Sequence, residues 1–353
     1  MALTLGQRAR LDFVLMARRA WAAQVYPALV ASLPSGEPTA AADGWERAAN
    51  AVASRVHASP IYPFFAFLER GLQKQLWRTV TDAVRDAEPA DEGASGPELG
   101  SLELDPDLEL PRWYVECDFH LQPGGVWQRE ANALVYQLGA RVVMLGENDA
   151  AEFHRRFVAT AIPPRPYRRI VDLGCGFGKS TFPLKEAFPD AEVIGIDLAA
   201  NLLRMAHRTA RRQGLEIRFR QADCTRTGLE DGSADLVSAT MLVHELPPPV
   251  TRACIAEAAR LLRPGGLLRV LDFHPTGDPV RDLAMVEHSD RNNEPYLREL
   301  FRSDVLGWCR EAGLADARWL AFDERGAGRL DDARWPERPE WHFPWAVLEA
   351  TRQ

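Results

Sequence analysis

A glycine-rich turn is the segment of this chain whose residue types most clearly predict a ligand site. The run Asp172-Leu-Gly-Cys-Gly-Phe-Gly178 follows a short apolar stretch and precedes a segment with helical character. Glycine has no Cβ, so such a turn can bend sharply and allow a ligand to touch the backbone. A strand, a glycine turn and a helix in this order are typical of sites for nucleotide-like molecules.

The spacing of the glycines separates three kinds of nucleotide site. A phosphate-binding P-loop requires a glycine five residues before Gly178-Lys179-Ser180, where this chain has Leu173. A dinucleotide-binding turn requires a glycine or another small residue in its sixth position, where this chain has Lys179. The remaining pattern is an acid, Asp172, at the head of three alternating glycines.

Four later segments continue this pattern in order. Ala191–Asp197 predicts a buried strand that ends in an acid, which could accept hydrogen bonds from both ribose hydroxyls of an adenosine. Gln221-Ala-Asp-Cys224 closes a third strand, and Asp235–Leu242 predicts a fourth that leads into His244-Glu-Leu-Pro247. Leu261-Leu-Arg-Pro-Gly-Gly266 then precedes a fifth strand.

Taken together, these motifs resemble the class I S-adenosylmethionine (SAM) dependent methyltransferases, nearest to the ubiquinone/menaquinone C-methyltransferase type, over residues 165–353. The resemblance implies an α/β fold with a doubly wound, seven-stranded Rossmann-like sheet. Its last strand should be antiparallel, and Trp345–Ala350 is the candidate. SAM is the implied cofactor and S-adenosylhomocysteine (SAH) the implied product.

The resemblance also implies which residues bind the cofactor. Asp172 should approach the amino group of its methionine part, and Asp197 should hold the ribose. Leu198 should lie against the adenine, and Asp223 with Cys224 should bracket the adenine edge. Asp172 and Asp223 could instead be turn or cap aspartates. The full set of cofactor residues is Asp172, Gly174, Cys175, Gly176, Gly178, Asp197, Leu198, Asp223, Cys224 and Met241.

Histidines and acids at the ends of predicted strands are the candidates for catalysis. His244 and Glu245 follow the fourth strand and His274 ends the fifth, at the edge of the sheet where ligands bind in open α/β folds. His274 could instead cap a turn beside Pro275. The polar stretch 288–296 could line an acceptor pocket or be a solvated loop. The substrate candidates are Tyr114, His120, Arg291, Asn292 and Tyr296.

The spacing of the possible metal ligands favours a site without a metal. Asp118 and His120, Asp272 and His274, and His288 and Asp290 each stand two residues apart, but none matches the magnesium ligands of catechol-type methyltransferases. We therefore expect no required metal.

Composition limits the partners that the chain can have. The net charge of −8 disfavours nucleic acid, which basic surfaces bind. Five cysteines without a Cys-x-x-Cys pair predict reduced thiols and a cytoplasmic protein. The longest apolar runs are too short for a membrane helix. We expect a chain that binds a small-molecule acceptor without a membrane anchor, with a homodimer as one possible assembly.

Periodicity divides the chain into four parts. Residues 1–86 should form a helical region and 87–110 an acidic, mobile linker, while 111–164 should form a connecting lid with the aromatic residues Trp113, Tyr114, Phe119 and Trp127. Residues 165–353 should form the α/β domain. Its strands are expected near 169–173, 191–197, 215–221, 234–240, 267–273, 315–322 and 342–349, and its helices near 179–188, 199–213, 249–262 and 302–312. Two further helices, near 128–139 and 148–159, are expected in the connecting segment.

The function that these patterns favour is transfer of a methyl group to O, C or N of a small molecule by direct in-line displacement. The acceptor would be a secondary metabolite or a quinone-like compound, on the resemblance alone. Two alternatives stay open: a protein methyltransferase, in which the helical region recruits a polypeptide, and a SAM-binding protein that does not methylate.

Overall fold

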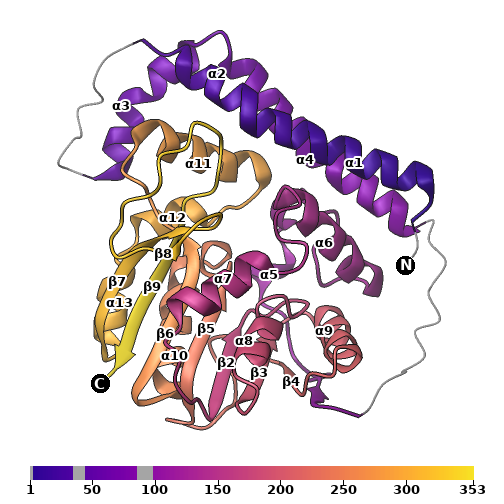
Figure 1. Ribbon diagram of the computed structural model, residues 1–353, viewed down its shortest axis with the longest axis vertical. Coiled ribbons are helices and arrows are strands. Elements are labelled where there is room, and N and C mark those ends of the chain that lie inside the picture. The colour runs from indigo at the N-terminus through magenta and orange to yellow at the C-terminus, as the bar shows by residue number, and fades with distance from the viewer. Residues whose placement is uncertain (1–2, 35–43, 86–97) are drawn as a thin grey trace.

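A twisted, mostly parallel sheet forms the centre of the α/β part of this chain (Figure 1). The computed structural model describes residues 3–34, 44–85 and 98–353. The strand order in the sheet is β1-β4-β3-β2-β5-β6-β9-β7-β8. The strands are β1 (Ser101–Glu103), β2 (Arg169–Leu173), β3 (Glu192–Asp197), β4 (Arg218–Gln221), β5 (Ala234–Thr240), β6 (Leu262–Phe273), β7 (Leu314–Asp323), β8 (Gly328–Arg329) and β9 (Trp345–Arg352).

The topology confirms the doubly wound fold that the sequence predicted. The chain winds outward from β2 to β3 and β4, then returns to β5 on the other side of β2, so the strand order reverses at β2. In open α/β sheets, ligands bind at the carboxyl ends of the strands beside such a reversal. β9 runs antiparallel to both β6 and β7, as expected of the last strand. The short edge strands β1 and β8 extend the seven expected strands.

Helices cover both faces of the sheet because its central strands are apolar on both sides. In β2, Ile170 faces one core cluster, and Val171 and Leu173 face the other. This alternation is typical of a parallel strand buried between two helical layers. Helices α7 (Glu152–Ala161), α8 (Thr181–Ala187) and α9 (Ala200–Arg212) supply residues to the first cluster, and α10 (Pro248–Leu261) and α13 (Val305–Glu311) supply the second.

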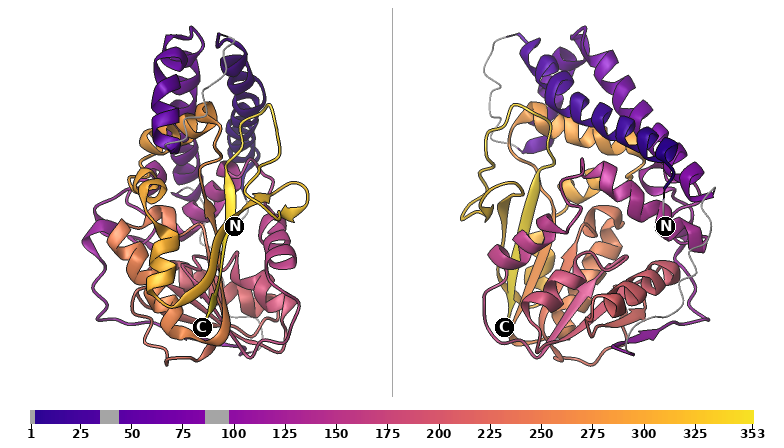
Figure 2. Two further views of the ribbon diagram at one scale, coloured as in Figure 1. Left: turned by 90° about the vertical axis from the view of Figure 1, so that its left-hand side faces the viewer. Right: turned by 45° about the vertical axis from the view of Figure 1, so that its right-hand side comes forward.

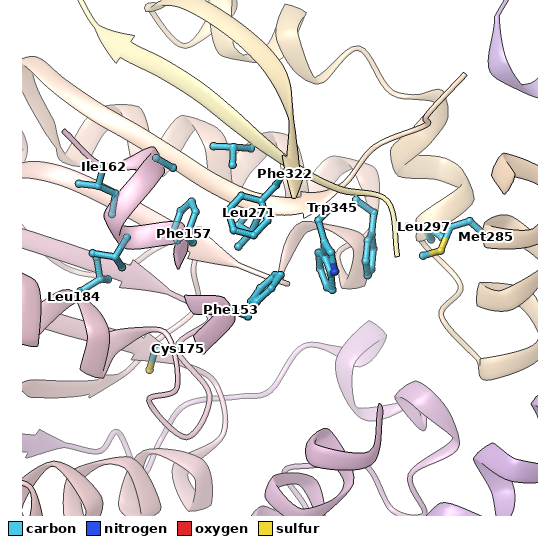
Figure 3. Close-up of a cluster of buried hydrophobic side chains, with 14 of the residues drawn as sticks. Phe153, Phe157, Ile162, Cys175, Leu184, Leu271, Met285, Leu297, Phe322 and Trp345 are labelled. Carbon is cyan, nitrogen blue, oxygen red and sulfur yellow. The ribbon is translucent and has the colours of Figure 1, made fainter. Parts of the chain in front are cut away.

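The first core cluster extends from the helices that flank the sheet to helix α11 (Pro279–Asn292), which lies beyond the carboxyl ends of the parallel strands. Figure 3 shows Phe153 and Phe157 of α7 beside Leu271 of β6, with Trp345 of β9 next to them. The rings of Phe153 and Trp345 lie 4.8 Å apart, centre to centre. Met285 belongs to the same cluster, so α7, the sheet and α11 share one apolar core.

The described part of residues 1–86 is helical, as the periodicity predicted, and forms a layer beyond the carboxyl ends of the parallel strands (Figures 1 and 2). We call this the helical layer. It packs on α11 and on α6 (Glu130–Val143), which belong to later parts of the chain. The helical layer consists of α1 (Leu5–Ala20), the π-helical turn η1 (Trp21–Val25), α2 (Tyr26–Ala31), α3 (Trp45–Ala58) and α4 (Tyr62–Arg85).

Two stretches differ from the sequence expectations. Within the predicted linker, residues 101–103 form β1, where Leu102 pairs with Phe219 of β4; residues 86–97 lie outside the described residues. Residues 279–292 form helix α11, and α12 (Leu297–Arg302) follows it. The sequence predicted no helix between residues 262 and 302. Asp278 begins α11 by accepting hydrogen bonds from the N–H groups of Val280 and Arg281.

None of the helices in the described ranges combines the length and the apolar character that crossing a lipid bilayer requires.

The contact between α4 and α6 provides a test of this packing. A Cβ added at Gly139 of α6 would lie 2.2 Å from Cζ3 of Trp77, a fully buried side chain of α4. Gly139→Ala should therefore lower the free energy of unfolding by about 1–3 kcal/mol, the usual cost of overpacking. Gly71→Ala on α4 is the control, because a Cβ there meets nothing within 4 Å, and alanine favours a helix by up to about 1 kcal/mol over glycine. Urea unfolding measures both, and equal stability of Gly139→Ala and wild type would contradict the packing.

Candidate functional site

The glycine turn after β2 leaves one backbone position open to a cavity. Gly174, Gly176 and Gly178 all have positive φ angles, +65°, +53° and +88°, which side chains rarely adopt. A Cβ on Gly178 would meet the Phe182 ring at 2.4 Å, so this glycine serves the packing of α8. A Cβ on Gly176 would meet nothing within 4 Å, and Gly176 lines the cavity. The open face of the turn is therefore at Gly176.

Asp197, at the end of β3, ties the glycine turn to the next strand. Its Oδ2 accepts a hydrogen bond of 2.8 Å from the N–H of Gly176, and its Oδ1 accepts one of 2.8 Å from Ala199. Burial raises the pKa of Asp197 to about 6, although these N–H donors oppose the shift. Asp197 and Leu198 line the cavity, so carboxylate lone pairs not used by the backbone are available there.

Asp172 lies deeper, beneath the turn. Its Oδ2 accepts hydrogen bonds from the hydroxyls of Ser180 (2.6 Å) and Thr181 (2.7 Å), while its Oδ1 is buried without a partner. Burial raises the pKa of Asp172 to about 6, against the effect of these two hydroxyls. An unsatisfied buried carboxylate oxygen is costly. It marks a place under the turn where a hydrogen-bond donor could be accommodated.

The chain after β4 contributes a backbone wall to the cavity. Ala222 and Cys224 line the cavity, but the carboxylate of Asp223 does not: its Oδ1 accepts from the N–H and the hydroxyl of Thr225. The hydrogen-bond contact with Cys254 and burial raise the pKa of Cys224 well above its usual value, and burial does the same for Cys175. Both cysteines line the cavity as neutral thiols.

Aromatic side chains enclose the rest of this cavity, which we call the glycine-turn cavity. The predicted lid residues Trp113, Tyr114, Phe119 and Trp127 all line it. Burial raises the pKa of Tyr114 well above its usual value, so its phenol stays neutral at ordinary pH. Met241, at the end of β5 with a φ of +54°, also lines the cavity. The result is an apolar, aromatic chamber that begins at the glycine turn.

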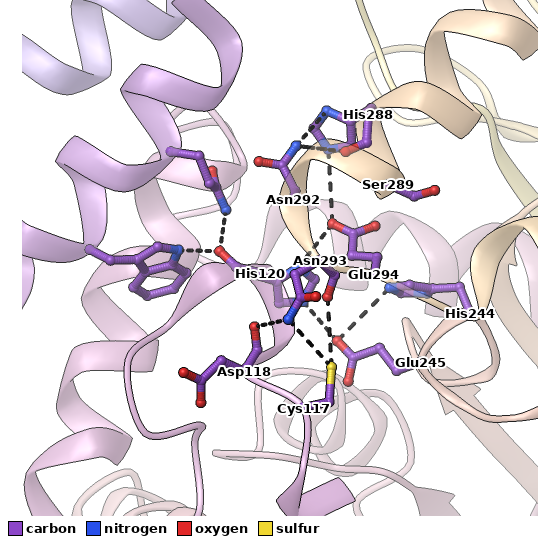
Figure 4. A network of polar contacts seen from close by, with 12 residues as sticks. Cys117, Asp118, His120, His244, Glu245, His288, Ser289, Asn292, Asn293 and Glu294 are labelled. Atoms are coloured by element: carbon purple, nitrogen blue, oxygen red, sulfur yellow. Dashed lines mark hydrogen bonds and ion pairs between the residues drawn. The ribbon is translucent and has the colours of Figure 1, made fainter. Parts of the chain in front are cut away.

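A polar cluster of three side chains stands at the wall of this chamber (Figure 4). We call His120, His244 and Glu245 the histidine cluster. Nε2 of His120 lies 2.8 Å from Oε1 of Glu245, and Nε2 of His244 lies 3.9 Å from the same oxygen. His120 belongs to the short 3-10 turn η2 (Phe119–Leu121), and the other two belong to η3 (Val243–Glu245), which follows β5. His120 and Glu245 line the cavity, and His244 is buried behind them.

Each histidine of the cluster is held by a second carboxylate. Nδ1 of His120 lies 2.9 Å from Oε1 of Glu294, and Nδ1 of His244 lies 2.7 Å from Oδ1 of Asp272. Burial alone would lower both histidine pKa values, but the neighbouring carboxylates outweigh it: Glu245 and Glu294 raise the pKa of His120 to about 10. Burial would raise the pKa of Glu294, yet His120 lowers it to about 2. His120 and Glu294 form a buried ion pair.

Helix α4 supports this arrangement from the helical layer. The carbonyl of His120 accepts hydrogen bonds from Nε2 of Gln73 (2.9 Å) and from Nε1 of Trp77. Glu69, one turn earlier on α4, is buried and binds both His288 and Arg291 of α11 through its two carboxylate oxygens. The position of the histidine cluster thus depends on contacts between α4, α11 and the sheet.

Several predicted site residues lie elsewhere, which corrects the sequence interpretation. His274 does not point into the glycine-turn cavity: β6 turns it toward a second cavity, where its ring lies 5.2 Å from that of Trp319. Arg291 and Asn292 are not loop residues that meet a substrate, because both belong to α11: Asn292 is buried, and the partly buried Arg291 binds Glu69 and Glu287. Tyr296 packs against the rings of Trp113 and Phe119, behind the cavity wall.

Sequence reasoning missed two residues of the site. Glu294 follows α11 in the stretch that we had predicted as an acceptor-facing or solvated loop, and Asp272 was considered only as the neighbour of His274. Cys117, whose Sγ accepts a contact of 3.6 Å from Asn293, lines the same cavity. The only local signal for these residues was their acidic or thiol chemistry close to His120 and to the end of β6.

Known proteins resemble this chain in its α/β part. Residues 170–266 match a family model described as a methyltransferase domain. A demethylmenaquinone methyltransferase of Thermus thermophilus is 36% identical over 140 residues, which cover 40% of this chain and 61% of that protein. A trans-aconitate 2-methyltransferase of Deinococcus radiodurans is 37% identical over 122 residues, 35% of this chain and 44% of that protein.

These matches are partial, because the chain spans 61% and 44% of the length of these two curated relatives. Among solved structures, one described as PigF with SAH has a TM-score of 0.47 at 16% sequence identity, and the match covers 78% of this chain and 69% of that one.

The buried carboxylate of Glu69 provides a test of the support beneath the site. Glu69→Gln should lower the free energy of unfolding at neutral pH by about 1–3 kcal/mol, because it removes the buried carboxylate that binds His288 and Arg291 and leaves Arg291 only its 3.3 Å contact with Glu287. Burial would raise the pKa of Glu69, but His288 and Arg291 lower it below the usual 4.5. The stabilisation that the Glu69 carboxylate provides is therefore present above pH 4.5 and is lost in more acidic solution. There the free energies of unfolding of wild type and variant should converge.

Urea unfolding at several pH values measures this difference. Glu116→Gln is the control, because Glu116 pairs with Arg112 at the surface and such pairs contribute little. A Glu69→Gln variant as stable as the control at neutral pH would show that the buried contact is not needed.

Proposed function

We propose that this chain, whose residues 170–266 match a family model described as a methyltransferase domain, transfers a methyl group from SAM to a small molecule. The observation that carries the proposal is the position of Asp197. Its carboxylate accepts a hydrogen bond from the N–H of Gly176 in the glycine turn, and the same residue lines an aromatic cavity. The matching relatives are named for small-molecule methylation, which supports the same class of reaction.

The residues around the glycine turn fit the cofactor. The open side of Gly176 gives room for backbone contact, and the lone pairs of Asp197 suit the two ribose hydroxyls. Leu198, Ala222 and Cys224 form an apolar slot beside them for an adenine ring. The unpartnered Oδ1 of Asp172 suits the ammonium of the methionine part, directly or through a water. When bound, SAM supplies a methyl group already activated by its sulfonium.

The chain then has to place an acceptor in line with that methyl group and exclude water. Positioning alone can supply on the order of 7–11 kcal/mol of barrier reduction. The aromatic wall of Trp113, Tyr114 and Trp127 can exclude water and can attract a cation through the faces of its rings. We infer that the acceptor lies between this wall and the histidine cluster, where His120 and Glu245 face the cavity.

An enclosed aromatic chamber fits a flat, largely apolar acceptor better than a polypeptide segment. We therefore prefer a quinone-like or related small molecule, methylated at O, C or N. Incubation of cell extracts with the protein and isotope-labelled SAM, followed by mass spectrometry, tests this proposal. A small molecule that gains one labelled methyl group supports it, and labelling of protein alone contradicts it.

Substitution of Asp197 tests the cofactor contact. Asp197→Ala should weaken SAH binding at least about 10-fold, because hydrogen bonds to a charged group contribute about 1.5–3 kcal/mol each. Asp223→Asn is the matched control, since Asp223 uses its side chain on Thr225 rather than on the cavity, and it should leave the affinity near that of wild type. Calorimetric titration with SAH measures both. Equal affinities for Asp197→Ala and wild type would place the ribose elsewhere.

Substitution of His244 separates catalysis from cofactor binding. His244→Ala should reduce turnover strongly while SAH affinity stays near that of wild type, because His244 lies beside Glu245 rather than among the residues at the glycine turn. Turnover is measured as SAH formed with the identified acceptor, and affinity by calorimetry. Full activity of the variant would remove His244 from the mechanism.

A further inference from the structure

The histidine cluster brings together three side chains that the sequence keeps far apart. His120 and Glu245 are separated by 125 positions, yet His120 Nε2 and Glu245 Oε1 lie 2.8 Å apart. One ligand-type atom of each of His120, His244 and Glu245 lies within 4.8 Å of the others. Two imidazole nitrogens and one carboxylate oxygen at the wall of a cavity are a donor set that binds transition metals.

The outer contacts of the two histidines are those of metal ligands. A metal-binding histidine usually gives its other ring N–H to a carboxylate, which fixes the orientation of the ring. Here His120 has Glu294 at Nδ1 and His244 has Asp272 at Nδ1, so both Nε2 atoms face Glu245. Asp272 is itself fixed, because it accepts 2.8 Å hydrogen bonds from the N–H groups of Val243 and Phe273.

The backbone at His120 is also held in an uncommon conformation. His120 has a φ of +57°, in the left-handed region that residues other than glycine seldom adopt. Two donors from α4, on Gln73 and Trp77, fix its carbonyl. Strained residues tend to lie at functional sites, where the surrounding structure keeps a side chain in place. The orientation of the His120 ring is therefore set from both its backbone and its Nδ1.

We propose that His120, His244 and Glu245 bind one divalent transition-metal ion, with zinc as the preferred ion. The ion would take the place of the proton between His120 Nε2 and Glu245. Two histidines and one glutamate, with a fourth position left open, are a ligand set of catalytic zinc sites. Magnesium and calcium prefer sets of oxygen ligands and fit this cluster poorly.

The open fourth position would face the glycine-turn cavity, and this part of the inference rests on the proposed function. An acceptor hydroxyl bound there loses its proton to solvent, because coordination to zinc lowers the pKa of the bound oxygen. The oxygen lone pair then forms the bond to the methyl carbon, while the methyl–sulfur bond breaks and its electron pair stays on sulfur. The products are the methyl ether, SAH and one proton.

Titration of the metal-stripped full chain with zinc chloride tests the site without any acceptor. Calorimetry should find one zinc ion per chain. The outer-contact variant Asp272→Asn should bind zinc about 10–100-fold more weakly, the usual effect of such a change. Glu245→Gln, which removes a ligand while keeping the shape of the side chain, should lose more than that. His274→Gln is the matched control, since His274 lies at a different cavity, and it should bind zinc like wild type.

Three outcomes would overturn the proposal: no zinc binding by the folded wild-type chain, equal affinity in Glu245→Gln and wild type, or tighter binding of magnesium than of zinc. Circular dichroism of each variant shows whether it is folded. Cobalt substitution adds a second readout, because visible absorption bands of a four-coordinate site should appear in wild type and be lost in Glu245→Gln. SAH titration of the same samples keeps the two proposals separate: SAH binding without zinc binding refutes only the metal site, and the reverse result refutes only the proposed function.

Discussion

The partly buried bridge made by His120 is the interaction on which the rest of the site depends. Its ring lies between Glu245, which follows a strand of the sheet, and Glu294, which follows α11, while its carbonyl is bound by α4. Three parts of the chain thus meet at one residue. Because a buried ion that loses its partner is strongly destabilising, these parts must stay together for the bridge to persist. The cavity is closed at the same place, since His120 is part of its wall.

This arrangement gives the helical layer a function that follows from its place in the fold. Open α/β sheets bind ligands at the carboxyl ends of their strands, and a sheet alone leaves that edge exposed to water. Here the helical layer and α11 lie across this edge (Figure 1). Aromatic side chains of the segment from Trp113 to Trp127 line the cavity there. Exclusion of water strengthens electrostatic contacts inside the chamber. The described helices of the helical layer therefore help to hold the wall of the cavity in place.

The sequence predicted the parts of this structure that are encoded locally. The strand, glycine turn and helix around Gly176 occupy adjacent positions, so their pattern can be read directly, and apolar runs located the central strands. Helix α11 was missed for a physical reason. It lies between the helical layer and the sheet, and buried polar residues such as His288 and Ser289 have hydrogen-bond partners inside the protein, Glu69 and the carbonyl of Val286. In a sequence, the same polarity is typical of a solvated loop.

The histidine cluster could not be predicted from the sequence either, because its members are far apart along the chain. No local spacing joins His120 to Glu245. Spacing did suggest pairs two residues apart, such as Asp272 with His274, but β6 ends at Phe273, and the chain beyond it places His274 at the second cavity. Asp272 turns to His244 instead. Only the fold, which brings the ends of β5 and β6 against η2, places these groups together.

The charges around the cluster explain why it requires a cation of some kind. Glu245, Asp272 and Glu294 place three carboxylates around two imidazoles, with Asp272 fully buried. Neutral imidazoles would leave this negative charge largely uncompensated in a region of low dielectric, which is costly. Protons on the imidazoles supply the compensation in one state, and a divalent ion bound at both Nε2 atoms would supply it in another. The two states differ at the cavity: a protonated cluster offers an acceptor only hydrogen bonds, whereas a metal offers it a coordination position.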